Sequence, residues 1–199
     1  MTTGYFRAMK RLLAVPAILV AVLLTPPASA AGAADSNTST IPIDAVTQLE
    51  LHVNANCVTA EGRCYFDTHA NLMTPAGPTG FPQDFWARQT ITLRSTDRSV
   101  WQEAQYSAPS GMPRESKGAN HDNVLSRLLK APSNAQISVT YFGGGPLERF
   151  AVDGVSVPTD WSTGRPNTEA DFIACSQIQV VYGGHNVTSP PACGQTTFS

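Results

Sequence analysis

The stretch QLELHVNANCVTAEGRCYFDTHAN, residues 48–71, determines the fold that the sequence predicts. It is typical of an antiparallel β-hairpin closed around residues 60–61, with Gly62 beside the turn to adopt dihedral angles that other residues avoid. In that register Cys57 faces Cys64 at a cross-strand separation of roughly 4.5–5.5 Å, which lies within the range that a disulfide requires. The two cysteines alone therefore predict one register.

The hydrophobic pattern of the hairpin supports the same register independently. Successive side chains of a strand point to opposite faces, so a register error would expose every apolar residue. The face that carries the cysteines is mostly apolar: Leu49, Leu51, Val53, Ala55, Phe66, Thr68, Ala70 and Leu72. The other face is polar, as in an antiparallel sheet with one solvated side.

The polar face of the hairpin brings two histidines together. His52 is the direct cross-strand partner of His69, and Asp67 lies two residues from His69 on the same side. Two imidazoles about 5 Å apart at their Cβ atoms, beside a carboxylate, could chelate zinc or copper. We favour the other interpretation, in which the histidines are solvated and repel each other when protonated, so no cofactor is expected. A four-ligand zinc site that also uses Cys57 is excluded, because His52 points to the opposite face.

The N-terminus is typical of a secretory signal peptide. Basic residues at positions 7–11 precede the apolar run 12–24, and an Ala-Ser-Ala sequence ends at Ala30. We therefore expect residues 1–30 to be removed and the protein to be secreted or extracellular, without a transmembrane segment after cleavage. Residues 31–40, AGAADSNTST, are small and polar and predict a flexible leader. Residues 41–199 then form a single β-rich domain.

Charge and cysteine content limit the class of protein further. After removal of residues 1–30, ten Lys and Arg residues stand against fifteen Asp and Glu, a net charge of −5. Without a basic stripe to displace phosphate counterions, nucleic-acid binding is not expected. An even number of cysteines in an exported chain indicates disulfides. We expect Cys175 to pair with Cys193, the alternative being a bridge from Cys175 to a hairpin cysteine, and we expect the strand ladder near Cys193 to fail at residues 190–191, both prolines.

Short segments rich in β-branched and aromatic residues, separated by many of the fifteen glycines and fifteen prolines, fill the rest of the chain. This pattern predicts an all-β fold, or a mainly β fold with one short helix: a β-sandwich stapled by two disulfides. The helix is expected in HDNVLSRLLKAP, residues 121–132, where the apolar residues fit one helical face. A buried strand is the alternative for this segment.

No motif of known chemistry marks a catalytic residue. The chain lacks Gly-x-Ser-x-Gly, His-Glu-x-x-His and Ser-x-x-Lys, and FGGGP at residues 142–146 fits a turn better than a phosphate loop. We therefore predict a noncatalytic module that binds a protein or glycan partner at the cell envelope through the long loops 74–85 and 108–122. The alternatives are a secreted hydrolase of envelope material that uses Asp67, His69 and His52, and an exported metal-binding protein that uses the same histidines. A tryptophan exposed near such loops could stack on a sugar ring.

Overall fold

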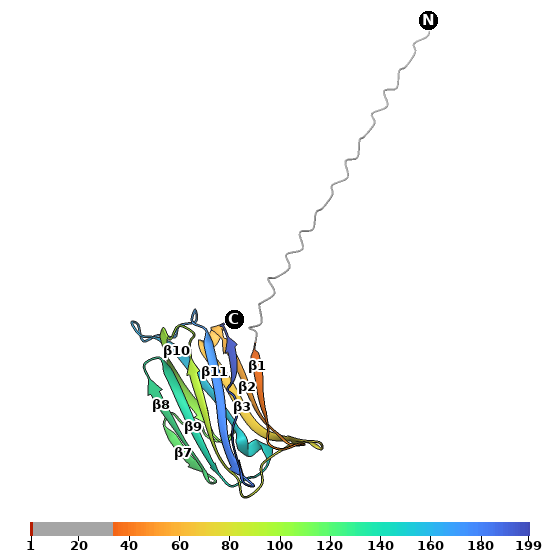
Figure 1. Ribbon diagram of the computed structural model, residues 1–199. Helices are drawn as coiled ribbons and strands as arrows, with labels where there is room; N and C mark the ends of the chain where they lie inside the picture. Colours follow the sequence, from red (N-terminus) through yellow and green to blue (C-terminus); the bar gives the residue numbers. More distant parts are fainter. Residues whose placement is uncertain (2–33) are drawn as a thin grey trace.

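The computed structural model describes Met1 and residues 34–199; the predicted signal peptide beyond Met1, and residues 31–33, lie outside the described residues. Two antiparallel sheets pack face to face as a sandwich (Figure 1). One sheet has the order β1 (Asp35–Pro42), β2 (Gln48–Val58), β3 (Arg63–Thr74), β10 (Ala151–Asp160), β6 (Val100–Ser107), with β4 (Gly77–Thr79) beside β3. The other has the order β12 (His185–Thr188), β11 (Phe172–Tyr182), β5 (Trp86–Arg94), β9 (Asn134–Phe142), β8 (Val124–Ala131), β7 (Gly118–His121), with β13 (Ala192–Thr196) beside β11.

The only helical elements within the described part of the chain are two short 3-10 turns, η1 (Thr59–Glu61) and η2 (Leu147–Phe150). The prediction of a β-sandwich is therefore confirmed, in its all-β form. Over residues 34–199 no helix has the length and apolar character needed to cross a bilayer.

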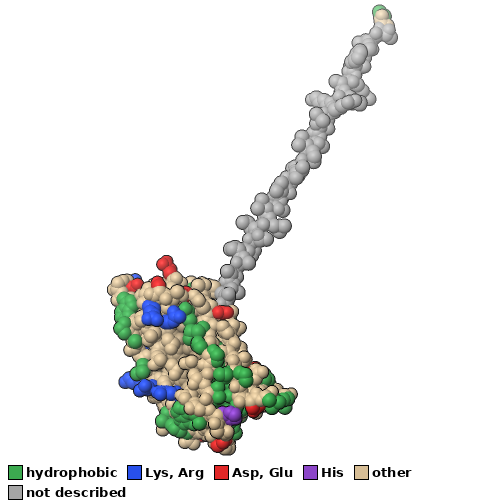
Figure 2. Space-filling view, in the orientation of Figure 1, with side chains coloured by type: hydrophobic (Ala, Val, Ile, Leu, Met, Phe, Trp, Pro, Cys, Tyr) green, Lys and Arg blue, Asp and Glu red, His purple; other side chains and the backbone are tan. Residues whose placement is uncertain are grey.

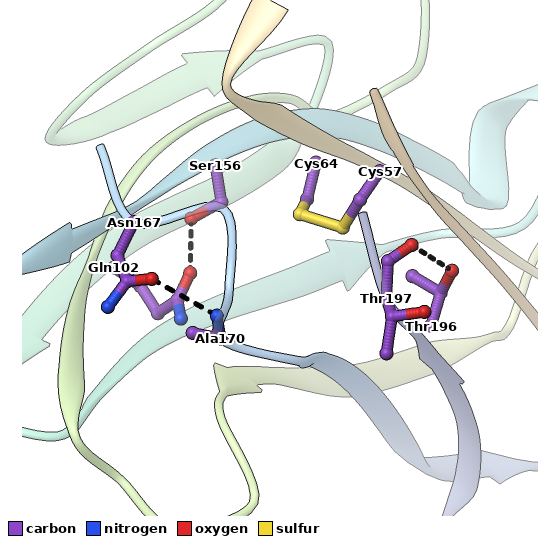
Figure 3. The surroundings of a disulfide bond; sticks show 8 residues. All are labelled: Cys57, Cys64, Gln102, Ser156, Asn167, Ala170, Thr196 and Thr197. Carbon is purple, nitrogen blue, oxygen red and sulfur yellow. Dashed lines mark hydrogen bonds between the residues drawn. A yellow bond between two sulfur atoms is a disulfide. The ribbon is translucent and has the colours of Figure 1, made fainter. Parts of the chain in front are cut away.

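The predicted hairpin forms in the predicted register. β2 and β3 pair with Cys57 opposite Cys64 and His52 opposite His69, and the two cysteines form a disulfide. Gly62 closes the turn with φ of 60°, in the left-handed region that glycine favours. The apolar face of the hairpin packs into the interior of the sandwich, where Cys57 and Cys64 are buried. Figure 3 shows this disulfide above the strands of the opposite sheet.

A buried polar network lies in the core between the sheets. The side chain of Gln89, on the inner face of β5, is fully buried. Its amide nitrogen donates to the hydroxyls of Thr68 (2.6 Å) and Ser176 (2.9 Å), and its carbonyl oxygen accepts from the Tyr141 hydroxyl (3.1 Å). Thr68 belongs to the six-stranded sheet and the other three residues to the seven-stranded sheet, so the network links the two layers.

The second disulfide joins Cys175 of β11 to Cys193 of β13, as predicted. Residues 183–184 close the β11–β12 hairpin, whose ladder ends at Thr188. Ser189 makes the last contact, since its N–H donates to the Ile178 carbonyl and its hydroxyl accepts the Ile178 N–H. The two prolines then interrupt the strand pairing. It resumes between β11 and β13, where each partner lies one residue further along the chain than the β11–β12 register would place it.

The preferred helix over residues 121–132 is wrong; the segment is a strand, as in the alternative, but a largely exposed one and not a buried one. β8 pairs with β9 along its whole length. Its inner position Val124 is fully buried, whereas Leu125 and Leu129 are 45% and 44% exposed on the outer face. Because β8 carries apolar side chains on both of its faces, their spacing in the sequence matched the apolar face of a helix.

The flexible leader predicted over residues 31–40 is also wrong from Asp35 onward. Residues 35–42 form β1, which pairs with β2 at the edge of the six-stranded sheet. An edge strand gains its hydrogen bonds from the backbone and tolerates polar side chains. Ser39, its one buried residue, donates a hydrogen bond from its hydroxyl to the Pro190 carbonyl (2.8 Å).

Candidate functional site

The first candidate site is built on the predicted histidine pair of β2 and β3. The rings of His52 and His69 stack with centroids 4.3 Å apart and an interplanar angle of 14°. His52 Nε2 lies 3.0 Å from the Asn71 side-chain oxygen, and Nδ1 lies 2.9 Å from the Thr38 hydroxyl. Because the Asn71 oxygen only accepts, the proton of a neutral His52 lies on Nε2, and Nδ1 then accepts from Thr38. Glu50 completes the cluster by accepting from the Asn71 amide (3.1 Å).

This histidine pair lies in an open depression of about 370 Å³, whose other walls include the apolar Met73 and Leu147 and the carboxylate residue Glu148. Partial burial lowers the pKa of His69 below its ordinary value, and the nearby His52 lowers it further, while Asp67 and Glu50 act in the opposite direction. The imidazole of His69 is therefore neutral at pH 7 and able to accept a proton.

The same geometry does not converge on a metal ion. The lone pairs of an imidazole lie in the ring plane, so two nearly parallel rings direct them side by side and not toward one point. Asp67 accepts a hydrogen bond from Asn54 (2.8 Å) and does not line the depression. Within the described residues no group of three or more His, Cys, Asp or Glu side chains is placed to hold a metal. Zinc or copper binding at the pair, the less favoured alternative, would require the rings to rotate.

The second candidate site is a groove of about 300 Å³ between the edges of the two sheets. Trp101 of β6 and Trp161, which follows β10, meet there edge to face, with ring centroids 4.8 Å apart and an interplanar angle of 77°. Trp161 is 47% exposed. Pro132 in the β8–β9 turn faces them, and the ion pair between Lys130 and Glu103 lies beside the groove. We call this the tryptophan groove.

A rigid turn presents Trp161 to the groove. One carboxylate oxygen of Asp160 accepts the backbone N–H groups of Ser162 and Thr163, each at 2.9 Å, and both of their hydroxyls. These bonds, that of the Ser162 hydroxyl above all, lower the pKa of Asp160. Gly164 has φ of 66° and donates its N–H to the Asp160 carbonyl (2.9 Å). These bonds fix the backbone of the turn that carries Trp161, and the Trp101 ring packs against its indole.

Two residues that line the tryptophan groove carry a buried hydrogen-bond donor without an acceptor among the described residues. The donors are Nε1 of Trp101 and the side-chain nitrogen of Gln102, a residue that is only 2% exposed. The Gln102 oxygen accepts from the Ser156 hydroxyl at 2.7 Å (Figure 3), which fixes the orientation of the amide. A buried donor without an acceptor costs about 1–3 kcal/mol. Both atoms are closed to solvent, so an acceptor oxygen of a ligand recovers that energy only if the side chains turn toward the groove.

The tryptophan groove was not predicted from the sequence. Binding was expected on the two long loops, but residues 74–85 carry β4 and pack against the glycine run at 143–145, while residues 108–122 carry β7. Neither loop lines the groove. The one local signal was the sequence Asp160-Trp161-Ser162-Thr163-Gly164, in which a turn-forming aspartate and a glycine enclose a tryptophan.

No protein-family model matches the chain, and no curated protein matches it. Among solved structures, the Clostridium perfringens delta-toxin aligns at 7% identity and a TM-score of 0.29, covering 82% of this chain and 88% of the toxin. A structure described as a pore forming protein aligns at 5% identity and a TM-score of 0.24, covering 82% of this chain and 87% of that one. TM-scores of this size do not define a shared fold, and the identities do not transfer a function.

Proposed function

We propose that this protein is an exported, noncatalytic binding module that takes a saccharide into the tryptophan groove. The observation that carries the proposal is the combination of an exposed indole with the two buried, unsatisfied donors of Trp101 and Gln102. The two disulfides support a place of action outside the cytoplasm, where such bonds persist. A glycan of the cell envelope fits this setting.

A saccharide matches the groove chemically. The C–H face of a pyranose is flat and apolar enough to stack on the exposed ring of Trp161, while its hydroxyl oxygens accept hydrogen bonds. Trp101 lines the groove beside Trp161, and the pair of Lys130 and Glu103 supplies a donor and an acceptor at the side. Apolar stacking with a few convergent polar groups is the usual composition of a small-ligand site.

Intrinsic fluorescence provides the test, since one of the three tryptophans is exposed in the groove. The protein is titrated with cello-oligosaccharides, chito-oligosaccharides and soluble peptidoglycan fragments. We expect a saturable change with at least one of them, weakened about thirtyfold in Trp161→Ala, the size of an interface anchor worth about 2 kcal/mol. Gln102→Leu should weaken binding about tenfold through the lost donor.

The matched control is Trp86→Phe, which changes a tryptophan of the opposite sheet. It should leave the affinity within about twofold of the unmodified protein, because surface changes away from a site are nearly neutral. The absence of any saturable change across the panel, or an equal loss in Trp86→Phe, would contradict saccharide binding in the groove.

A second candidate, a hydrolase of envelope material, is favoured by one observation: a neutral, half-buried His69 lies in a depression beside Glu50. None of the residues that line the depression is a serine, threonine or cysteine. Such an enzyme would have to activate water with His69 as general base. Release of soluble fragments from cell-wall material, abolished in His69→Gln and retained in Trp161→Ala, would establish this candidate in place of the binding module.

A further inference from the structure

The seven-stranded sheet is free of acidic residues. None of its strands contains Asp or Glu, although they carry Arg88, Arg94, Arg127 and Lys130. The strands of the six-stranded sheet contain six carboxylates: Asp35, Glu50, Asp67, Glu103, Asp153 and Asp160. Figure 2 shows basic atoms within the face formed by β8, β9 and β11, and acidic atoms at its two ends. The two faces of the sandwich therefore differ in charge.

Two of these arginines converge on one hollow. β9 lies between β5 and β8. On its outer face Thr140 pairs with Arg88 of β5, and Ser138 pairs with Arg127 of β8. Both guanidinium groups and both hydroxyls line a hollow of about 240 Å³, which Leu125 borders on the β8 side. Arg88 Nε donates to the Ser138 hydroxyl (3.3 Å), which orients that guanidinium along β9.

The positive charge of this hollow is not compensated. Three basic side chains of the described chain have carboxylate partners: Arg114 pairs with Asp153, Lys130 with Glu103 and Arg149 with Asp122. Most of the others have none, so what sets Arg88 and Arg127 apart is that two unpaired arginines line the same hollow. Arg88 and Arg127 form no ion pair within residues 34–199. Two like charges held beside one hollow repel each other and attract an anion.

We propose that the hollow between Arg88 and Arg127 binds the phosphate group of a phosphate ester. Guanidinium forks match the oxygens of phosphate, and the hydroxyls of Ser138 and Thr140 donate further hydrogen bonds. The hollow is larger than a bare phosphate ion, and Leu125, 45% exposed at its border, offers contact for an organic substituent. Two sources share this chemistry: a soluble phosphomonoester and the headgroup of a phospholipid. The site lies on the sheet face away from the histidine depression and does not depend on saccharide binding.

The test uses residues 31–199, the protein without the predicted signal peptide. Arginine side-chain Nε–H resonances are followed by NMR during titration with inorganic phosphate and with glycerol 3-phosphate, at constant ionic strength set by acetate. We expect saturable shifts for Arg88 and Arg127 with a dissociation constant of about 1–10 mM, the range for a small exposed ligand. Arg88→Gln and Arg127→Gln should each weaken binding about tenfold, the loss of a charge-assisted pair of hydrogen bonds.

Arg94→Gln is the matched control, since Arg94 lies on the same face of β5 but outside the hollow. It should change the affinity less than about twofold. Shifts that do not saturate, or an equal loss in Arg94→Gln, would reduce the effect to general charge attraction and overturn the proposal. Both exposed arginines can be replaced without emptying the core, and unaltered thermal unfolding of each variant checks this.

Vesicles distinguish the two sources. The protein is sedimented with phosphatidylcholine vesicles, with or without phosphatidylglycerol. Retention on the anionic vesicles that falls in Arg88→Gln and Arg127→Gln, and that glycerol 3-phosphate competes away, identifies a lipid headgroup. Saturable binding of glycerol 3-phosphate without retention identifies a soluble ester. Retention that neither arginine variant reduces, together with no saturable phosphate shift, contradicts the site.

Discussion

Replacing the buried glutamine of the core is expected to cost much more stability than its change in volume suggests. Leucine at position 89 is close to glutamine in size, so Gln89→Leu leaves no large cavity. It does remove three hydrogen bonds, those to Thr68, Ser176 and Tyr141. All three partners are at most 1% exposed, so water does not replace the lost bonds.

The size of the stability loss depends on which of the three partners is left with an unsatisfied hydrogen-bonding group. Gln89 is the donor to Thr68 and Ser176 but the acceptor for the Tyr141 hydroxyl, so Gln89→Leu leaves the tyrosine with a buried donor that has no partner. Each buried unsatisfied group costs about 1–3 kcal/mol, so we expect a loss of about 2–4 kcal/mol in the free energy of unfolding. Adding Tyr141→Phe removes the orphaned donor, so the double variant should be less destabilised than the sum of the two single changes.

Equilibrium unfolding in urea measures both effects, with the slope against denaturant as a check on two-state behaviour. An unchanged slope with a loss below about 1 kcal/mol in Gln89→Leu would refute the reasoning, because the bonds would then contribute no more than typical exposed ones. Strict additivity of Gln89→Leu and Tyr141→Phe would show that the two side chains are not coupled.

Four further expectations concern other parts of the molecule. The pKa of His69 lies below its ordinary value, so the unfolded chain takes up the proton first and the free energy of unfolding falls as pH drops through the ordinary histidine pKa. His69→Asn should weaken this dependence of the free energy of unfolding on pH. An unchanged dependence would assign it to other groups. Gly144→Ala should prevent stable folding, since its Cβ would lie 1.9 Å from a backbone carbonyl oxygen; a normal melting temperature would contradict the close approach. Replacing Cys175 and Cys193 with alanine opens a loop of 18 residues and should cost about 3 kcal/mol in chemical unfolding, with a loss under about 1 kcal/mol arguing against the chain-entropy account. Calorimetric titration with zinc or copper should give no specific heat, and a heat that disappears when both His52 and His69 become alanine would restore the metal site.

The hairpin was predictable from sequence because two independent constraints agreed. Cys57 and Cys64 define a register, and the alternation from Leu49 to Leu72 requires the same one. β8 was not predictable in the same way, because Val124 faces inward while Leu125 and Leu129 face outward, and periodicity alone does not separate such a strand from a helix. Its identity as a strand depends on pairing with β9, a tertiary contact.

The two candidate sites also differ in whether the sequence could predict them. The His52 and His69 pair follows from the hairpin register and was located by counting residues, although the ring stacking and the bonds to Thr38 and Asn71 were not. The tryptophan groove combines β6, the turn after β10 and the β8–β9 turn, and Gln102 faces inward among core residues. Nothing local in the sequence marks Gln102 as lacking a partner, because that depends on which acceptors the second sheet brings near it.

The disulfide of β11 and β13 also determines how the molecule would respond to mechanical force. A pull on the C-terminus can detach only the residues after Cys193 before the tension passes through the sulfur atoms into β11, which is bonded to β5 on its other side. The segment of 18 residues between the two cysteines cannot be stretched while the disulfide is intact. At roughly 3.5 Å per residue, the disulfide therefore prevents about 60 Å of extension. Reduction would release that length as a separate step, so under force the protein would extend further in a reducing medium than in an oxidising one.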